Sequence, residues 1–160
     1  MTIGISFDGC VQDVCRFYAD GSKTGAHMTR NAKMLLRYLP NSLAMATIAP
    51  ECAGQYTDTV TYLYELGFRR IHLTPAYGKR VHWTEQTLEI LCKELEKTAD
   101  IYKAQIIAGH PLQITTLDAK ISDCILGRNP DNRCHLGLRQ MPVDTDGTLY
   151  PLSLIHISEP

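Results

Sequence analysis

Cys134 starts a stretch whose residue types suit a metal site. Downstream, the sequence predicts a hairpin with arms at residues 140–143 and 148–150. Such a hairpin brings a residue before it close to a residue after it, and thiolates at both places could share a soft metal ion. The second ligand is expected to follow Pro151, but Leu152 stands there. The residues alone therefore indicate one candidate metal ligand, Cys134.

The other five cysteines form no recognisable ligand or redox motif. No two of them are spaced as C-x-x-C, which excludes a zinc ribbon and a thioredoxin-type site. A disulfide framework is not expected, because nothing in the sequence indicates an oxidising compartment. Cys92 stands inside an amphipathic pattern and is interpreted as a small buried hydrophobe. These five are Cys10, Cys15, Cys52, Cys92 and Cys124.

Polar side chains stand near the ends of two strand-like runs. Ser6 and Asp8 end the first run, Arg16 follows in a polar segment, and Thr47 stands near the end of the second run. Loops after strands often carry function. Each residue also has a structural interpretation: Ser6 and Thr47 as ordinary strand residues, Arg16 as a solvated charge. Asp8 is interpreted as a residue that turns or caps the backbone.

Length, charge and hydropathy bound the class of protein. The 160 residues suffice for one core of ordinary size, and 44% hydrophobic with 21% charged residues is typical of a globular chain. Sixteen basic and seventeen acidic side chains nearly cancel, which argues against binding to nucleic acid or an anionic membrane. No apolar run approaches the roughly 20 residues of a membrane span, and residues 1–4 lack the basic segment that begins a signal peptide. A cytoplasmic protein is predicted.

The elements that must position these side chains alternate between strand and helix. Helical periodicity follows each apolar run; the first helix ends at Pro40, and the second ends at Gly67, which suits a left-handed C-cap. Thr84 is placed to cap the third and longest helix. His72 alternates with apolar neighbours in the third run and is interpreted as a satisfied core or barrel histidine. The predicted strands are residues 2–7, 43–49 and 70–74.

Alternation at this spacing predicts an α/β fold with parallel strands and right-handed helical crossovers. Three strand–helix units make half of a barrel or half of an open doubly wound sheet. In both architectures, ligands bind at the C-terminal ends of the strands. After Ala104 the pattern weakens, and residues 109–133 are predicted to be loop-like.

Four segments of the chain carry recognisable motifs: 6–9 (SFDG), 16–21 (RFYADG), 62–75 and 134–151. Taken in order, they resemble motifs of radical S-adenosylmethionine enzymes of the anaerobic sulfatase-maturase and peptide-maturase type. The segment 6–9 (SFDG) is similar to that family's S-[IL]-D-G, and 16–21 (RFYADG) to its R-x-F-x-D-G. The segment 62–75 (YLYELGFRRIHLTP) resembles the fifth helix and sixth strand of the family's barrel. From Cys134 to 151 the chain resembles the start of a SPASM auxiliary-cluster domain.

The resemblance implies roles for individual residues. Ser6 and Arg16 match positions that hold the methionyl carboxylate of S-adenosylmethionine, a role that suits a hydroxyl and a guanidinium. Asp8 in the same motif, and Thr47 at the end of the next strand, are further candidate cofactor-binding residues. Cys134 matches a thiolate ligand of an auxiliary 4Fe-4S cluster.

The resemblance also implies a fold, a division of the chain and partners. The fold would be the C-terminal half of a partial (β/α)6 TIM-like barrel, followed by the start of a small cysteine-ligated SPASM domain. The barrel part would cover residues 1–104, a linker 105–133 and the truncated SPASM part 134–151. Partners would be a peptide or protein substrate and a reductant such as flavodoxin or ferredoxin.

Two departures from the family bear on activity. The C-x3-C-x2-C that binds the catalytic cluster is absent, and so is the G-G-E-P turn. Residues 152–160 (LSLIHISEP) match the translation of a transposase-type sequencing adapter and are excluded from the fold. The chain is therefore expected to be an inactive internal fragment of a maturase that acts through a 5′-deoxyadenosyl radical.

Two alternative hypotheses come from other classes of protein. One is a non-catalytic iron–sulfur or zinc-binding module in which the α/β part only supports Cys134. The other is a complete small α/β domain that binds a phosphorylated ligand at its strand ends. The second alternative predicts an open sheet with covered edges, whereas a cut barrel should expose an apolar edge.

Overall fold

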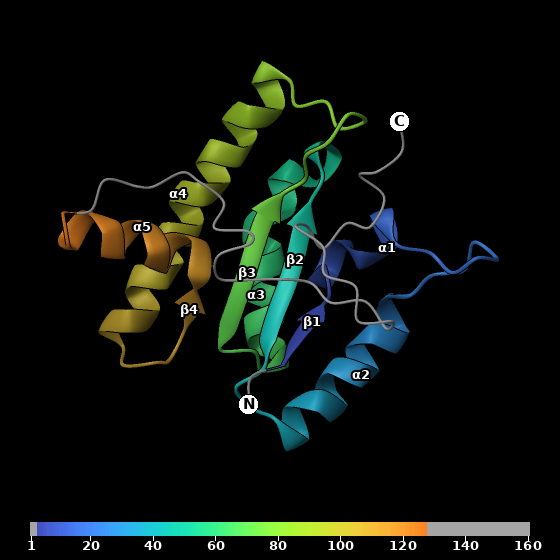
Figure 1. Cartoon of the computed structure of the whole chain (residues 1–160), viewed down its shortest axis with the longest axis horizontal. Coiled ribbons are helices and arrows are strands. Elements are labelled where there is room, and N and C mark those ends of the chain that lie inside the picture. Colours follow the sequence, from blue (N-terminus) through green and yellow to red (C-terminus); the bar gives the residue numbers. More distant parts are fainter. Residues whose placement is uncertain (1–2, 128–160) are drawn as a thin grey trace, which may run out of the picture.

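The computed structural model describes residues 3–127, which form an α/β fold around one parallel sheet (Figure 1). The strands follow each other in sequence order, and each pairs in parallel with the next. The α/β class and the parallel arrangement that the sequence predicts are confirmed. The strands are β1 (Gly4–Ser6), β2 (Leu43–Ile48), β3 (Arg70–Pro75) and β4 (Gln113–Ile114).

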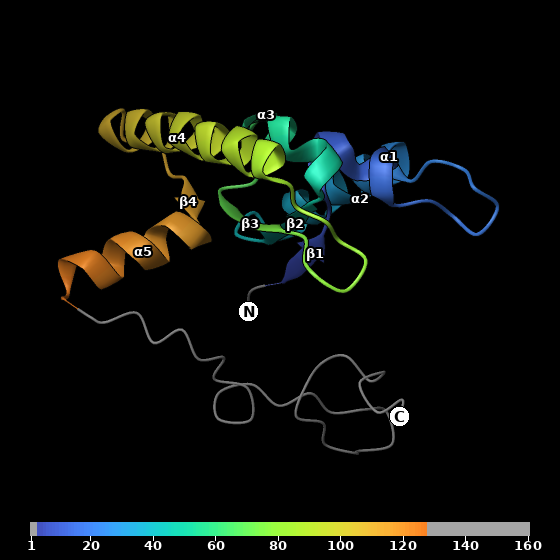
Figure 2. The same cartoon turned by 90° about the horizontal axis from the view of Figure 1, so that it is seen from above.

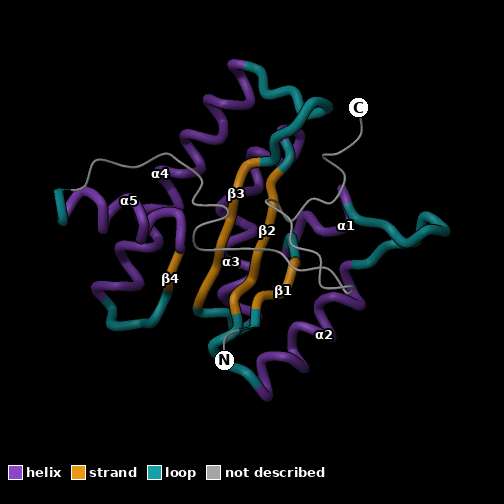
Figure 3. Tube along the Cα trace, viewed as in Figure 1, coloured by secondary structure: helices purple, strands orange, loops and turns teal. Residues whose placement is uncertain are grey.

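The helices follow the strands in turn. Within the described residues, short helical turns and four longer helices alternate with the strands along the chain, as the tube trace shows (Figure 3). The helical elements are η1 (Gly9–Val11), α1 (Gln12–Cys15), α2 (Gly25–Tyr38), η2 (Pro50–Gln55), α3 (Tyr56–Leu66), α4 (Glu85–Ile107) and α5 (Thr115–Ile125).

One face of the sheet carries the helices and the core. Figure 2 shows α3 and α4 together on one side of the strands. The small and branched residues of β2 and β3 that point to this side are fully or almost fully buried, and these are Ala44, Ala46, Ile48, Ile71 and Leu73. They alternate along each strand with more exposed residues, as expected of a strand whose two faces differ in burial. The core therefore lies between the sheet and its helices.

Two helix ends confirm the sequence predictions. Thr84 precedes α4 and accepts a hydrogen bond from the backbone N–H of Thr87, whose hydroxyl in turn accepts one from the backbone N–H of Thr84. Gly67 ends α3 with φ 120° and ψ −3°, in the left-handed region. The connection from the end of α3 to β3 therefore depends on a residue without a Cβ atom.

Two sequence predictions are wrong. Residues 109–133 were predicted to be loop-like, but β4 and α5 lie within them, and β4 adds a fourth strand to the predicted three. β4 has only two residues, so its strand character comes from pairing with β3 rather than from its own pattern. Cys92 was predicted to be buried, but it is exposed on the outer side of α4.

Several predictions fall outside what residues 3–127 can show. Cys134, the hairpin after it and residues 152–160 all lie outside the described residues. The partial barrel and the start of a SPASM domain remain predictions. Among the described helices, none combines the length and the apolar character that crossing a membrane requires.

Candidate functional site

The second face of the sheet carries the predicted cofactor-binding residues. Ser6 and Thr47 are exposed and so is Met45, whose side chain is 40% exposed. Ser6 pairs with Met45 in the register between β1 and β2, and Thr47 follows Met45 by two residues. Because side chains two residues apart on a strand point to the same side, Ser6, Met45 and Thr47 share this face. We call it the open face; no helix among the described residues covers these three side chains.

Asp8 forms a junction at the C-terminal ends of β1 and β2. Its carboxylate is buried and accepts a hydrogen bond from the backbone N–H of Thr47, with 2.9 Å between nitrogen and oxygen. The same carboxylate pairs with Arg16 through two nitrogens, Nε and Nη2, the second at 3.2 Å. A two-nitrogen pair of this kind fixes the plane of the guanidinium as well as its position. Asp8 therefore links two strand ends to Arg16.

The Arg16 side chain is placed between protein and solvent. It is 39% exposed, although Asp8 beside it is only 3% exposed. Two of its nitrogens bind Asp8, and among residues 3–127 the third, Nη1, has no partner. An arginine in this state is oriented by one carboxylate and can still donate to a second.

The polar segment after β1 is held in place by its own hydrogen bonds. The Gln12 side chain accepts from the backbone N–H of Asp8 at 2.9 Å and donates to the Thr24 hydroxyl at 3.0 Å. The Thr24 hydroxyl donates to the backbone carbonyl of Arg16 at 2.8 Å. Further along, Asp13 accepts from the backbone N–H of Gly25 at 2.7 Å, at the start of α2. The loop that carries Arg16 is therefore fixed at both ends.

His72 also points to the open face. It pairs with Met45 in the register between β2 and β3, and it is partly buried, whereas its neighbours Ile71 and Leu73 are fully buried. Its Nδ1 lies 2.6 Å from the Thr115 hydroxyl at the start of α5. Ser6, Met45 and His72 thus form one row across three strands. The predicted orientation of His72, opposite to Ile71 and Leu73, is confirmed, and the side chain has a hydrogen-bond partner; its place in a barrel remains a prediction.

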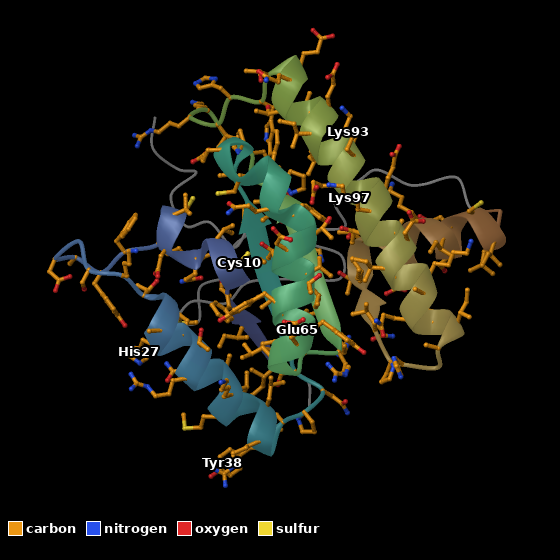
Figure 4. The ribbon with its side chains drawn as sticks, turned by 180° about the vertical axis from the view of Figure 1, so that it is seen from behind. Cys10, His27, Tyr38, Glu65, Lys93 and Lys97 are labelled. Carbon is orange, nitrogen blue, oxygen red and sulfur yellow. The ribbon has the colours of Figure 1, made fainter. Side chains whose placement is uncertain are left out.

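The thiols near this junction do not form a metal site. No group of three or more histidine, cysteine, aspartate or glutamate side chains within residues 3–127 could hold a metal ion. Burial raises the pKa of the Cys52 thiol to about 11, and neighbouring Cys15 and Glu51 add to the effect. Cys10 lies on the helical side of the sheet, 3.3 Å from the Thr59 hydroxyl of α3 (Figure 4).

The structure brings together three of the predicted site residues directly and places a fourth beside them. The Arg16 side chain and the backbone N–H of Thr47 both donate to the Asp8 carboxylate, and Ser6 stands diagonally across from Thr47 on the same face. The prediction missed Gln12 and Thr24, which hold the loop. It also missed Met45 and Thr115. The alternation of residues 43–48 could have identified Met45, since it places Met45 on the same side of the strand as Thr47.

The open face offers donors suited to an anionic ligand with hydroxyl groups. The hydroxyls of Ser6 and Thr47 have no hydrogen-bond partner among the described residues, and Arg16 provides one positive charge nearby. Hydroxyls and a guanidinium together can bind a carboxylate through charge-assisted hydrogen bonds. The carboxyl edge of a parallel sheet is the usual place for such a site in α/β proteins.

Comparison with known proteins yields matches in structure but not in sequence. No family model matches the chain, and no curated protein matches it in sequence. Native anSMEcpe with bound AdoMet matches with a TM-score of 0.75 and 18% identity, over 94% of this chain and 44% of that chain. With bound AdoMet and Cp18Cys peptide, the same enzyme matches with a TM-score of 0.74 and 18% identity, over 95% and 44% of the two chains.

These structures confirm the resemblance that the sequence motifs indicate. anSMEcpe is an anaerobic sulfatase-maturating enzyme, a radical S-adenosylmethionine enzyme with a SPASM domain. At 18% identity the likeness establishes the fold and nothing finer. The chain spans less than half the length of the enzyme it matches. The chain is therefore similar in fold to a part of a radical S-adenosylmethionine enzyme.

Proposed function

We propose that this chain is the S-adenosylmethionine-binding part of a radical S-adenosylmethionine maturase that modifies a peptide or protein. The observation that carries the proposal is the Asp8 junction, which holds Arg16 beside the strand ends where Ser6 and Thr47 present free hydroxyls. The fold likeness to anSMEcpe, with AdoMet and peptides bound in that enzyme, supports the proposal.

In this proposal the chain's own residues bind and orient the cofactor. Arg16 donates to the methionyl carboxylate, and its pairing with Asp8 keeps the guanidinium in one orientation as the cofactor enters. The Ser6 hydroxyl provides a second donor to that carboxylate, and Thr47 a polar contact on the neighbouring strand. Bound beside a reduced 4Fe-4S cluster elsewhere in the parent protein, S-adenosylmethionine would supply the radical chemistry for hydrogen abstraction from the substrate.

The whole protein would supply the remaining parts. Residues 3–127 contain no group of cluster ligands, so we propose that the catalytic cluster is held elsewhere in the parent protein. The four strands would then belong to a partial barrel, with a SPASM domain starting at Cys134. A peptide substrate and a reductant such as flavodoxin or ferredoxin complete the proposal. The 160-residue chain by itself is proposed to be inactive.

Titration calorimetry of the chain with S-adenosylmethionine tests the proposal. Arg16→Gln should weaken binding by about tenfold, the equivalent of one charged hydrogen bond. Lys33→Gln is the matched control, because Lys33 is an exposed cation on α2 away from the strand ends. Absence of binding, or equal binding by the Arg16→Gln chain, would contradict the proposal. Reconstituted anaerobically, the chain should form no 5′-deoxyadenosine.

A further inference from the structure

The loop between β3 and α4 lies beyond the C-terminal ends of the strands, on the side of the open face. It runs from Ala76 to Thr84 and leaves the C-terminal end of β3. Figure 1 shows it beyond the tips of β2 and β3, and Figure 2 shows it extending past the sheet on the side away from α3 and α4. We call residues 76–84 the β3–α4 loop. The loop backbone therefore lies beside the C-terminal ends of β2 and β3, on the side of the open face.

The side chains of this loop are cationic, aromatic and exposed. Lys79, Arg80 and His82 are all exposed, and Tyr77 is 81% exposed. No acidic residue occurs from residue 75 to 84. Among the described residues, Lys79 and Arg80 form no ion pair, since the two ion pairs found there join Arg16 to Asp8 and Lys97 to Glu94. The loop therefore presents two exposed cations that form no ion pair within residues 3–127.

The loop backbone is held by hydrogen bonds, although Lys79 and Arg80 form no ion pair with any residue from 3 to 127. The Trp83 indole N–H donates to the carbonyl of Ala76 at 2.8 Å and closes the base of the loop. Ala76 donates through its backbone N–H to the carbonyl of Ile48 at 2.7 Å, and a turn joins the N–H of Val81 to the carbonyl of Gly78 at 3.1 Å. A loop that is already ordered loses less conformational entropy when it binds a partner than a loop that must first fold.

We infer that the β3–α4 loop binds an acidic segment of the peptide substrate, next to the residue that is modified. This inference rests on the proposed function, since it names the class of peptide that the maturase would take. Lys79 and Arg80 complement carboxylates, and Tyr77 offers the kind of exposed aromatic surface that often dominates peptide binding. Nucleic acid fits less well, because the chain as a whole has a net charge of −1.

Fluorescence anisotropy with two labelled peptides tests the inference. The probe is a short fluorescein-labelled peptide in which aspartate alternates with serine, and its counterpart has asparagine at every aspartate. The 160-residue chain should bind the acidic peptide more tightly than the asparagine peptide, and added salt should weaken that binding. Lys79→Glu/Arg80→Glu should weaken it by about fivefold or more, because two attractive contacts become repulsive.

Matched variants separate the loop from general charge effects. Lys33→Glu/Arg37→Glu on α2 makes the same change in net charge on exposed residues of another element, and it should leave peptide binding within about twofold. Lys79→Gln/Arg80→Gln only removes the two charges, so it gives an intermediate loss even if charge reversal disturbs the fold. The inference is overturned if the acidic peptide does not bind, if both peptides bind equally, or if the α2 variant weakens binding as much as the loop variant.

Two further measurements distinguish a peptide from a nucleic acid as the partner, and separate this inference from the proposed function. An oligouridylate of equal charge that binds more tightly than the acidic peptide, through the same two residues, would overturn the peptide assignment. S-adenosylmethionine binding should be unchanged in the loop variants. Loop-dependent peptide binding without S-adenosylmethionine binding would remove the proposed function and leave an acidic-peptide surface. S-adenosylmethionine binding without acidic-peptide binding would remove this inference alone.

Discussion

The carboxylate of Asp8 accepts a hydrogen bond at 2.9 Å from the backbone N–H of Thr47, a residue 39 positions further along the chain. The end of β1 is thereby tied to the end of β2 by a side chain, beyond the last residue pair of their ladder. The same carboxylate holds Arg16. Asp8 therefore belongs to a segment that resembles a cofactor-binding motif and also links two strands. Cofactor binding and stability can be measured separately.

Replacing Asp8 with alanine should lower the free energy of unfolding by about 1–3 kcal/mol. The substitution leaves the N–H of Thr47 without its acceptor in a partly buried place and frees the Arg16 guanidinium. Urea unfolding followed by circular dichroism measures the change. Asp100→Ala, on the exposed side of α4, is the control and should stay within about 0.5 kcal/mol of the original chain. Equal effects of the two substitutions would show that the junction contributes no stability.

The thiols should react with iodoacetamide in an order set by burial and pKa. Cys52 is buried, and burial raises its pKa to about 11, so almost none of it is thiolate at pH 8. Cys92 and Cys124 are exposed and should be alkylated before Cys52. Peptide mass mapping after increasing reaction times measures the order. Alkylation of Cys52 as fast as Cys92 in the folded chain would contradict the burial on which this prediction depends.

The fold could be predicted as far as local patterns determine it. The apolar run at residues 43–49, the cap at Thr84 and the glycine at 67 are local signals. The strand β2, the capped start of α4 and the left-handed end of α3 are found as these signals predict. β4 could not be predicted in this way, because two residues carry no periodicity and pair only once β3 is in place. The prediction that Cys92 is buried is wrong for a related reason. Helical periodicity does not show how far the neighbouring elements extend around α4.

The candidate site could be predicted residue by residue but not as a junction. Ser6, Asp8, Arg16 and Thr47 are recognisable from their types and positions. The bond between Asp8 and Thr47 depends on the register in which Ser6 pairs with Met45, and no local signal in either strand specifies that register. The cations of the β3–α4 loop are visible in the sequence, but the place of the loop beyond the tips of β2 and β3 is not.

Gly67→Ala should destabilise the chain by about 1 kcal/mol or more. Gly67 has φ 120°, where a Cβ atom is strained, and that atom would lie 3.3 Å from Cδ1 of Leu36 on α2. Gly54→Ala is the matched control: its φ is not positive, and its Cβ would make an ordinary contact at 3.6 Å with Ile90. Thermal unfolding should place the Gly67 variant several degrees below the Gly54 variant. A Gly67 variant as stable as the Gly54 variant would show that α3 can end without a left-handed residue.

Glu94 of α4 is a buried carboxylate that caps a different helix. Its Oε2 accepts from the backbone N–H of Thr57 in the first turn of α3 at 3.1 Å, and the Thr57 hydroxyl donates to the carbonyl of Glu94 at 3.0 Å. Oε1 accepts from the ammonium of Lys97, one of the two α4 lysines labelled in Figure 4. A negative charge at the first turn of α3 also complements the positive end of its dipole.

Glu94→Gln should lower the stability at pH 7 by about 1 kcal/mol, and the loss should shrink as the pH falls. Burial alone would raise the pKa of Glu94, but hydrogen bonds from Lys97 and Thr57 outweigh it and leave the pKa below its ordinary value of 4.5. A carboxyl whose pKa is lower in the folded chain stabilises the fold above the unfolded pKa and loses that effect as the pH falls through the folded pKa. Urea unfolding of both chains at pH 7, 5, 4 and 3 measures the difference. Glu96→Gln, exposed on the same helix, is the control and should differ little from the original chain at any of these pH values. A Glu94→Gln difference that stayed constant from pH 7 to pH 3 would mean that ionisation of Glu94 does not contribute to stability.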